Sequence, residues 1–515
     1  MYCQFAAGAW MCLLLAATLA RPLSAQDTPA ARQAAAAITP ELIRQHVFVL
    51  ADDSMRGRKT PSPELEAATQ YAASQLRRAG LPPGGDRQSY FQRYPVEQVQ
   101  VLTDSAALWT TGTQPMRWTY GVEYAPHPYN DFADWTAQGS AVLLVGDLGG
   151  PVSFDTVSLR GRVLVVPLTA AGFGPHFGRI AAWQPAAALR VVDVPDSSIA
   201  RLATAAARPT TRIPGAIMAR PPMLVVTDRA AQPLVARAGV DLGELRRSRT
   251  DRVLRAIPLG DAVVHVRLRT RPVVHQDPAN VIAILEGADP ALRNEYVIYT
   301  AHMDHLGVGD PIGGDSIYNG ADDNASGTAA VLAVASAFAS LPSPPRRSVM
   351  FVLVTGEEGL GGGGSEYFLR NPPVPVPAMA ANFNADMVGR NWRDTVVVVG
   401  RRDSDLGHTV DSVTAVLPEL GLAVADTSSR PGDASEVYSL WSDHAAFIRR
   451  GIPFLYFYSG MHPDYHGMGD SPDKIDAEKL ARISRLMFYI GLRVANADTR
   501  PRWDPDSYAR LVPRR

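Results

Sequence analysis

A polar segment rich in histidine and aspartate lies between a strand and a buried helix in residues 295–341. Residues 295–299 (EYVIY) are typical of a strand, and residues 326–341 (SGTAAVLAVASAFASL) have the alanine content and apolar spacing of a buried helix. In open α/β sheets, ligands gather at the carboxyl ends of the strands. There the side chains of His302 and Asp322 would present an imidazole and a carboxylate, which suit zinc or a similar divalent metal.

A second strand leads into a pair of glutamates. Residues 348–355 (SVMFVLVT) form an unbroken apolar run, which is typical of a strand buried on both faces. Glu357 and Glu358 come directly after it, and both cannot be ordinary core residues because burying an unpaired charge is costly. Since neighbouring side chains point in different directions, one glutamate can bind a metal while the other faces a bound water.

Two further apolar runs end near candidate ligands. Residues 378–386 (AMAANFNAD) end in Asp386, and the strand-like run 454–458 precedes His466. The candidate ligands now include two histidines and three carboxylates, which are too many for one tetrahedral zinc. They suit two metals that share one carboxylate and together clamp a water and a carbonyl oxygen.

The remaining acids of these segments have roles beside the metals. If Glu358 is a ligand, Glu357 is free to act as the general base that takes a proton from the water. Asp304 lies two residues after His302, so it is a candidate to accept the other ring N–H of that histidine.

These motifs resemble those of the co-catalytic di-zinc aminopeptidases, a family that includes enzymes of the glutamate carboxypeptidase type. The matching strings are AHMDHLG (301–307), NGADDNASG (319–327), TGEEGLGGGGSEYF (355–368), NADMVGR (384–390), SDHAAF (442–447) and YHGMGDSPDKID (465–476). The resemblance implies an α/β zinc exopeptidase fold, in which helices flank a mixed, mostly parallel central sheet.

The resemblance also implies a site that holds two zinc ions per chain. Its expected ligands are His302, Asp322 (bridging), Glu358, Asp386 and His466. Glu357 is expected to be the general base and Asp304 the partner of a ligand histidine. No ligand role is implied for His305 or His444.

The N-terminal residues 1–25 are typical of a secretory signal peptide. An apolar run over 5–20 is followed by a small residue at position 25, and the run is shorter than the ~20 residues of a membrane-spanning helix. Both cysteines, Cys3 and Cys12, lie in this segment. The sequence therefore predicts a thiol-free mature protein exported to the periplasm or the extracellular space.

A change in the pattern of predicted elements along the chain indicates an insertion in the catalytic domain. Short β-rich runs separated by turns occupy residues 105–272, and strands are predicted at 140–145, 161–167, 222–226 and 262–268. SLRGRVLVV (158–166) resembles part of a protease-associated domain. The catalytic domain would then comprise residues 26–104 and 273–497, with 498–515 as a tail. Within it, residues 280–287 and 295–300 are predicted to be paired strands.

Charge and motifs together define the expected function. Lys and Arg number 50 and Asp and Glu 51, with no basic stripe for nucleic acid and no later apolar run long enough for stable membrane insertion.

We expect an exported metallo-exopeptidase, foremost an aminopeptidase that cleaves N-terminal residues from peptides through a metal-bridged hydroxide with a glutamate base. A carboxypeptidase or dipeptidase of the same family is the alternative. A non-catalytic receptor-like module is disfavoured because all five ligands and the base are present, and cobalt or manganese could replace zinc.

Overall fold

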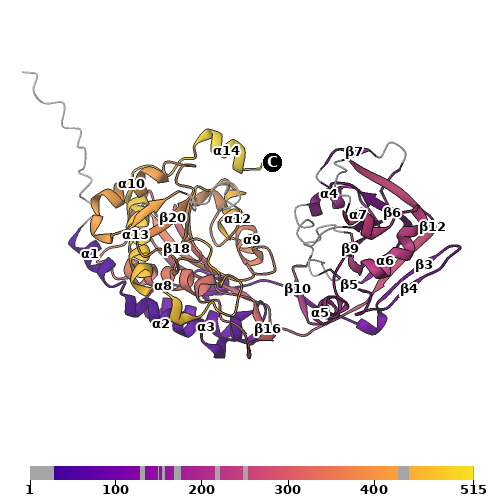
Figure 1. The fold of residues 1–515 in the computed structure, drawn as a ribbon. Helices are drawn as coiled ribbons and strands as arrows, with labels where there is room; N and C mark the ends of the chain where they lie inside the picture. The colour runs from indigo at the N-terminus through magenta and orange to yellow at the C-terminus, as the bar shows by residue number, and fades with distance from the viewer. Residues whose placement is uncertain are drawn as a thin grey trace, which may run out of the picture. The chain divides into compact units, whose positions relative to one another are not determined.

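The computed structural model describes residues 28–127, 134–148, 150–153, 157–167, 176–214, 221–247, 253–426 and 440–513. The predicted signal peptide, with Cys3 and Cys12, lies outside these residues. The chain divides into two compact units, one made of Met1–Tyr94 and Pro278–Arg515 and the other of Pro95–Asp277 (Figure 1). The second unit extends beyond the range 105–272 in both directions.

The first unit is built on an eight-stranded sheet with the strand order β1-β14-β18-β15-β19-β22-β20-β21. The four strands in its centre run parallel to one another, and antiparallel strands flank them on both sides. This confirms the predicted mixed, mostly parallel α/β sheet. The strands are β1 (Phe91–Arg93), β14 (Ala279–Leu285), β15 (Tyr296–His302), β18 (Ser348–Val354), β19 (Met379–Ala385), β20 (Thr395–Val399), β21 (Ala423–Ala425) and β22 (Phe454–Tyr458).

One predicted pairing in this sheet is wrong. β14 and β15 are consecutive strands of this sheet in the sequence, but β18 lies between them and pairs with both, antiparallel to β14 and parallel to β15. A parallel pair needs a long crossover, and helix α8 (Gly327–Ala339), which lies between β15 and β18 in the chain, supplies part of it. Adjacent strands in the chain are therefore not adjacent in the sheet.

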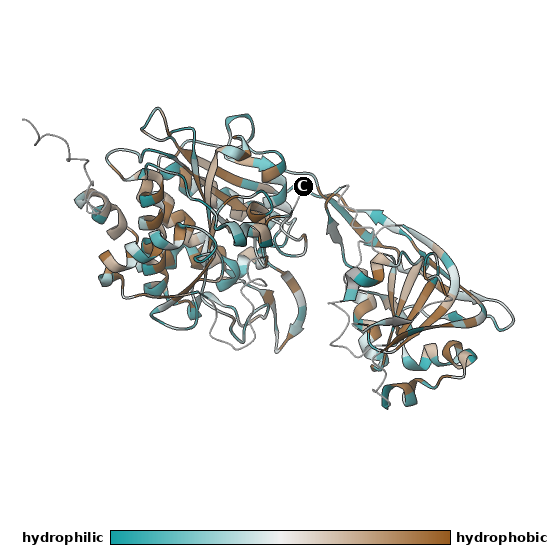
Figure 2. Cartoon of the chain, turned by 90° about the horizontal axis from the view of Figure 1, so that it is seen from above, coloured by the Kyte–Doolittle hydropathy of each residue, from teal (hydrophilic) through white to brown (hydrophobic). Residues whose placement is uncertain are grey.

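Helices cover both faces of this sheet because its strands carry apolar side chains on both faces. Val297, Tyr299 and Ala301 of β15 face one helical layer, and Ile298 faces the other. The first layer contains α1 (Pro29–Ala36), α2 (Pro40–Leu50), α3 (Pro63–Arg78), α8, α10 (Leu406–Val416) and α13 (Ala477–Asn496). The second contains α9 (Gly363–Arg370) and α12 (His444–Ile448), and α14 (Pro505–Leu511) packs near β22. Figure 2 shows the apolar strands between these helices.

The second unit has its own core around a nine-stranded sheet, with a three-stranded sheet beside it. The runs predicted as strands at 140–145, 161–167, 222–226 and 262–268 all fall mostly within observed strands, although helices are present as well. Its likeness to a protease-associated domain stays a prediction. The elements are β2 (Glu97–Val101), β3 (Ala107–Thr111), β4 (Arg117–Trp118), β5 (Tyr124–Pro126), β6 (Trp135–Val145), β7 (Val152–Ser153), β8 (Val163–Pro167), β9 (Ala187–Val192), β10 (Thr210–Arg212), β11 (Met223–Thr227), β12 (Leu254–Leu268), β13 (Thr270–Pro272), α4 (Phe177–Ala182), α5 (Asp196–Ala206), α6 (Asp228–Val235) and α7 (Leu242–Arg247).

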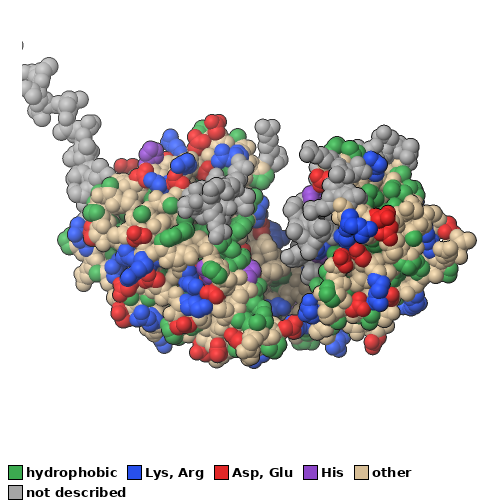
Figure 3. All heavy atoms as spheres, in the orientation of Figure 1, with side chains coloured by type: hydrophobic (Ala, Val, Ile, Leu, Met, Phe, Trp, Pro, Cys, Tyr) green, Lys and Arg blue, Asp and Glu red, His purple; other side chains and the backbone are tan. Residues whose placement is uncertain are grey.

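The distribution of charged side chains on the surface agrees with the nearly equal numbers of basic and acidic residues in the sequence. On the face shown in Figure 3, basic and acidic side chains are interspersed. Across the described ranges, no helix combines the length and the apolar character that a membrane crossing requires.

Candidate metal centre

The candidate ligands come together at the carboxyl ends of the parallel strands. His302 is the last residue of β15, Asp386 comes directly after β19, and Glu358 lies just beyond β18. His466 lies in the loop after β22. Because parallel strands end at the same edge of a sheet, segments far apart in sequence deliver their side chains to one place. The fifth member is Asp323, in the short irregular turn η7 (Ala321–Ser326).

A first cluster surrounds the imidazole of His302, which is 1% exposed. Its Nε2 atom lies 3.4 Å from Asp323 Oδ1 and 3.4 Å from Asp386 Oδ1. His302 Nε2 and Asp386 Oδ1 form no hydrogen bond with any described atom. Ligand atoms at ~2.0–2.2 Å from a tetrahedral zinc are ~3.3 Å apart, so these spacings fit a metal better than they fit direct pairing.

A second cluster surrounds the other carboxylate oxygen of Asp323, Oδ2. His466 Nε2 is 3.2 Å from Asp323 Oδ2 and 3.0 Å from Glu358 Oε1. Although burial opposes it, hydrogen bonding to these two carboxylates raises the pKa of His466 to about 10. The negative potential that holds this proton also attracts a divalent cation. Asp323 thus contributes one oxygen to each cluster, as a bridging ligand does.

The prediction that Asp322 is the bridging carboxylate disagrees with this geometry. The Asp322 carboxylate is fully buried and accepts a 2.6 Å hydrogen bond from the backbone N–H of Gly389. Its other oxygen lies 3.3 Å from His462 Nε2. The irregular backbone at Asp323 (φ −106°, ψ 90°) turns the two neighbouring side chains to different partners. Asp322 therefore supports the loop, and Asp323 occupies the shared position.

Asp304 supports the site in a different way from the one expected. Its carboxylate accepts hydrogen bonds from the backbone N–H groups of Glu357 and Glu358, both at 3.3 Å, and from Thr60 Oγ1 at 2.8 Å. The Nδ1 atom of His302 is 3.2 Å from the Asp304 carbonyl oxygen but 3.8 Å from its carboxylate. The carbonyl thus orients the histidine, and the carboxylate holds the glutamate segment.

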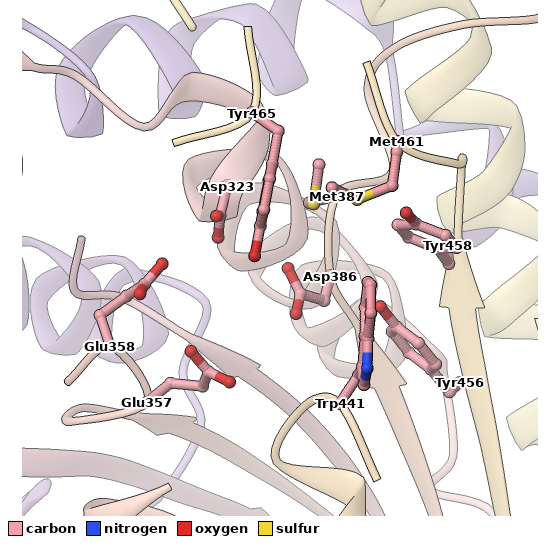
Figure 4. Close-up of a pocket in the computed structure, with 10 residues that line it drawn as sticks. All are labelled: Asp323, Glu357, Glu358, Asp386, Met387, Trp441, Tyr456, Tyr458, Met461 and Tyr465. Atoms are coloured by element: carbon pink, nitrogen blue, oxygen red, sulfur yellow. The ribbon is translucent and has the colours of Figure 1, made fainter. Parts of the chain in front are cut away.

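Glu357 lies beside the clusters at the edge of a cavity. Burial raises the pKa of its carboxyl well above the ordinary value, and Asp443 and Glu358 add to the rise. A raised pKa brings a carboxyl closer to the range in which a general base works at neutral pH. Acidic, aromatic and thioether side chains line this cavity, in which Tyr465 lies close to Asp323 and Asp386 (Figure 4). The lining comprises Asp323, Glu357, Glu358, Asp386, Met387, Trp441, Tyr456, Tyr458, Met461 and Tyr465.

Arg58 is a supporting residue that sequence reasoning missed. Its side chain is fully buried and donates to the backbone carbonyls of Leu50, Met303, Asn319 and Gly320. The guanidinium therefore ties the end of β15 to the loop that carries Asp323. Burial lowers its pKa to about 10, with the nearby Asp304 acting in the opposite direction. The segment 56–59 (RGRK) has three basic residues, and this composition gave no sign that Arg58 is buried.

An α/β domain with two histidine–carboxylate clusters at the ends of its parallel strands has the architecture of the co-catalytic zinc peptidases. Residues 280–491 match the model of peptidase family M28. The match contains every residue of the two clusters.

Parts of this chain are similar in sequence to known peptidases. Aminopeptidase YwaD of Bacillus subtilis (strain 168) is 27% identical over 229 residues, 43% of this chain and 45% of that protein. Leupeptin-inactivating enzyme 1 of Streptomyces exfoliatus is 31% identical over 182 residues, 35% and 36% of the two chains. This chain thus aligns with less than half of each. The structure of an aminopeptidase from Aneurinibacillus sp. strain AM-1 superposes with a TM-score of 0.55, and the alignment spans 90% of this chain and 95% of that one. The aligned residues are 18% identical, so this likeness shows a shared fold.

Proposed function

We propose that this chain is an exported di-zinc aminopeptidase that removes apolar residues from the N-termini of peptides. The single observation that carries the direction of cleavage is the charge of the cavity. Four of its described lining residues are acidic and none is Lys or Arg. Glu357 is the one of these four that the proposal leaves without a metal, so its carboxylate can bind a peptide's free ammonium group. No described lining side chain offers a cation to the terminal carboxylate that a carboxypeptidase must bind. The match of residues 280–491 to the model of family M28 and the similarity to an aminopeptidase support the same activity.

The donor set supports zinc as the metal. Imidazole nitrogens and carboxylate oxygens are both ordinary zinc ligands. His302 and Asp386 would hold one ion, Glu358 and His466 the other, and Asp323 would bridge them. The two ions would supply the Lewis acidity that polarises the scissile carbonyl and lowers the pKa of a water.

The protein's own groups would carry the proton. Glu357, held by the hydrogen bond from its backbone N–H to Asp304, would take a proton from the attacking water and pass it to the leaving amine. Tyr465 lies near Asp323 and Asp386 in Figure 4, where its hydroxyl could donate to the oxygen that gains negative charge. Met387, Trp441 and Met461 would contact an apolar first side chain.

The predicted signal peptide supports export. Its segment, residues 1–25, combines a short apolar run with a small residue at its end. Cell fractionation of the full-length chain tests this part of the proposal separately from the activity.

Matched peptides test the direction of cleavage. One leucyl peptide is offered with free termini, with an acetylated N-terminus, and with an amidated C-terminus, and initial rates are compared with and without chelator. We expect acetylation to abolish hydrolysis and amidation to leave it nearly unchanged. Hydrolysis of the acetylated peptide that requires a free carboxyl terminus would support a carboxypeptidase instead. No hydrolysis of any dipeptide or longer peptide by zinc-loaded protein would support a binding module.

A further inference from the structure

A third imidazole faces the second cluster. His305 is 1% exposed, and its Nδ1 atom lies 3.4 Å from Glu358 Oε1 and 3.9 Å from Asp323 Oδ2. These are the same two carboxylate oxygens that His466 Nε2 approaches. The rings of the two histidines are 5.8 Å apart in an edge-to-face arrangement. Two nitrogens therefore converge on the same pair of oxygens.

The ring nitrogens of His305 have no hydrogen-bond partner in the described part of the chain. Neither Nδ1 nor Nε2 forms a hydrogen bond with a described atom, although the ring is buried. A buried imidazole without a hydrogen bond costs free energy unless another interaction compensates for it. His444, by comparison, stacks on Tyr456 at 4.3 Å and lies outside both clusters.

Packing holds the His305 ring in this position. A Cβ atom at Gly320 would lie 2.4 Å from His305 Cγ and 2.5 Å from Cδ2, so only glycine leaves room for the ring. Gly320 has φ 59°, and its carbonyl accepts a hydrogen bond from Arg58. The loop is thus built closely around an imidazole whose Nδ1 faces the carboxylates of Glu358 and Asp323 without forming a hydrogen bond to either.

We propose that His305 is a fourth protein ligand of the second metal, beside Asp323, Glu358 and His466. This inference rests on the proposed function, because it assumes that metal occupies both clusters. The 3.4 Å between His305 Nδ1 and Glu358 Oε1 matches the ~3.3 Å edge of a zinc tetrahedron with ligands at ~2.0–2.1 Å. The same spacing separates the ligand atoms of the first cluster.

The two metal sites then differ in character. The second site would have two nitrogens and two oxygens from the protein, one ligand more than the first, and a water or substrate oxygen would join it as a fifth ligand. The first site would have His302, Asp323 and Asp386, and would keep an open position for water or substrate. Partial chelation should therefore remove the first ion before the second.

Zinc affinity of His305→Leu tests this ligand role. Leucine keeps much of the ring's volume and removes both nitrogens. We expect the affinity of one of two zinc ions to fall more than the ~10–100-fold typical for loss of an outer partner of a ligand. His305→Asn, whose side-chain oxygen lies near the position of Nδ1, should recover part of it. In wild-type protein, X-ray absorption should report three imidazoles shared between two zinc ions, and His305→Leu should report two.

Thermal unfolding of metal-free and zinc-loaded protein separates ligation from packing. His305→Leu should unfold close to wild type without metal and gain less stability from zinc, since a ligand stabilises in proportion to its affinity for the folded state. The control His46→Asn changes a buried histidine that bonds to Tyr71, and should lower metal-free stability while the zinc-induced shift stays unchanged.

Two outcomes would overturn the inference or its foundation, and they are distinguishable. Wild-type affinity and three imidazoles in His305→Leu, or only two imidazoles in wild type with two bound zinc ions, would exclude His305 as a ligand. Failure of wild-type protein to bind two zinc ions would instead contradict the proposed function.

Discussion

Asp322 and Asp323 are adjacent in the chain, yet their carboxylates serve different partners. Asp323 Oδ1 lies 3.4 Å from His302 Nε2, whereas Asp322 Oδ1 accepts a hydrogen bond from the backbone N–H of Gly389 at 2.6 Å. One residue therefore joins the two metal clusters, and its neighbour fastens the loop.

Substitution of this pair should separate metal binding from loop support. Asp323→Asn removes the negative charge shared by both clusters, so we expect loss of both zinc ions and of activity. Asp322→Asn keeps an oxygen that can accept from Gly389, so both ions should remain. Elemental analysis of the two purified variants measures this. Retention of two metals by Asp323→Asn together with their loss from Asp322→Asn would restore Asp322 as the bridge.

The glutamate pair should fail in two different ways. Glu357→Gln keeps the side chain's size but cannot accept a proton, so the rate should fall by ~10²–10⁴-fold with both zinc ions retained. Glu358→Gln removes a charged ligand and should weaken one metal site, with activity partly restored by added zinc. Metal content and initial rates, measured on both variants, test the assignment. Loss of metal from Glu357→Gln alone would exchange the two roles.

Arg58→Met should destabilise the first unit strongly. Four backbone carbonyls lose their buried donor, and each unsatisfied group costs ~1–3 kcal/mol, so the free energy of unfolding should fall by at least about 3 kcal/mol. Arg402→Met is the control, because that side chain is 83% exposed and its ion pair with Asp426 should contribute under ~1 kcal/mol. Urea unfolding measures both. Equal effects would show that the buried carbonyls find other donors.

His46 should make the folded state sensitive to mild acid. Burial lowers the pKa of His46 from the ordinary 6.5 to about 4. As pH falls from 6.5 to 4, the unfolded chain takes up a proton at this site that the folded chain does not, so stability is lost over that range. The stability advantage of metal-free wild type over His46→Asn should therefore shrink between pH 7 and pH 4. An advantage that stays constant with pH would contradict the shift.

Much of the fold could be predicted because burial leaves a clear mark on sequence. The unbroken apolar run that became β18, and the run before Asp386, each identified a parallel strand with acidic residues at its carboxyl end. Candidate ligands at strand ends were found for the same reason.

The errors arise where long-range contacts decide the outcome. Which of Asp322 and Asp323 faces the metals depends on the backbone of η7, and both have the same side chain. Arg58 reaches Met303 across 245 residues, so local sequence contains no sign of the contact. Likewise, β18 lies between β14 and β15 in the sheet, although its residues come after both of these strands in the sequence.

The products formed from one unblocked peptide test the proposed activity most directly. A peptide that begins with several different apolar residues is incubated with the zinc-loaded chain, and mass spectrometry monitors the fragments over time. An aminopeptidase gives a ladder of peptides shortened one residue at a time from the N-terminus, and chelator stops it. A ladder shortened from the C-terminus, or internal fragments without a ladder, would contradict the proposal.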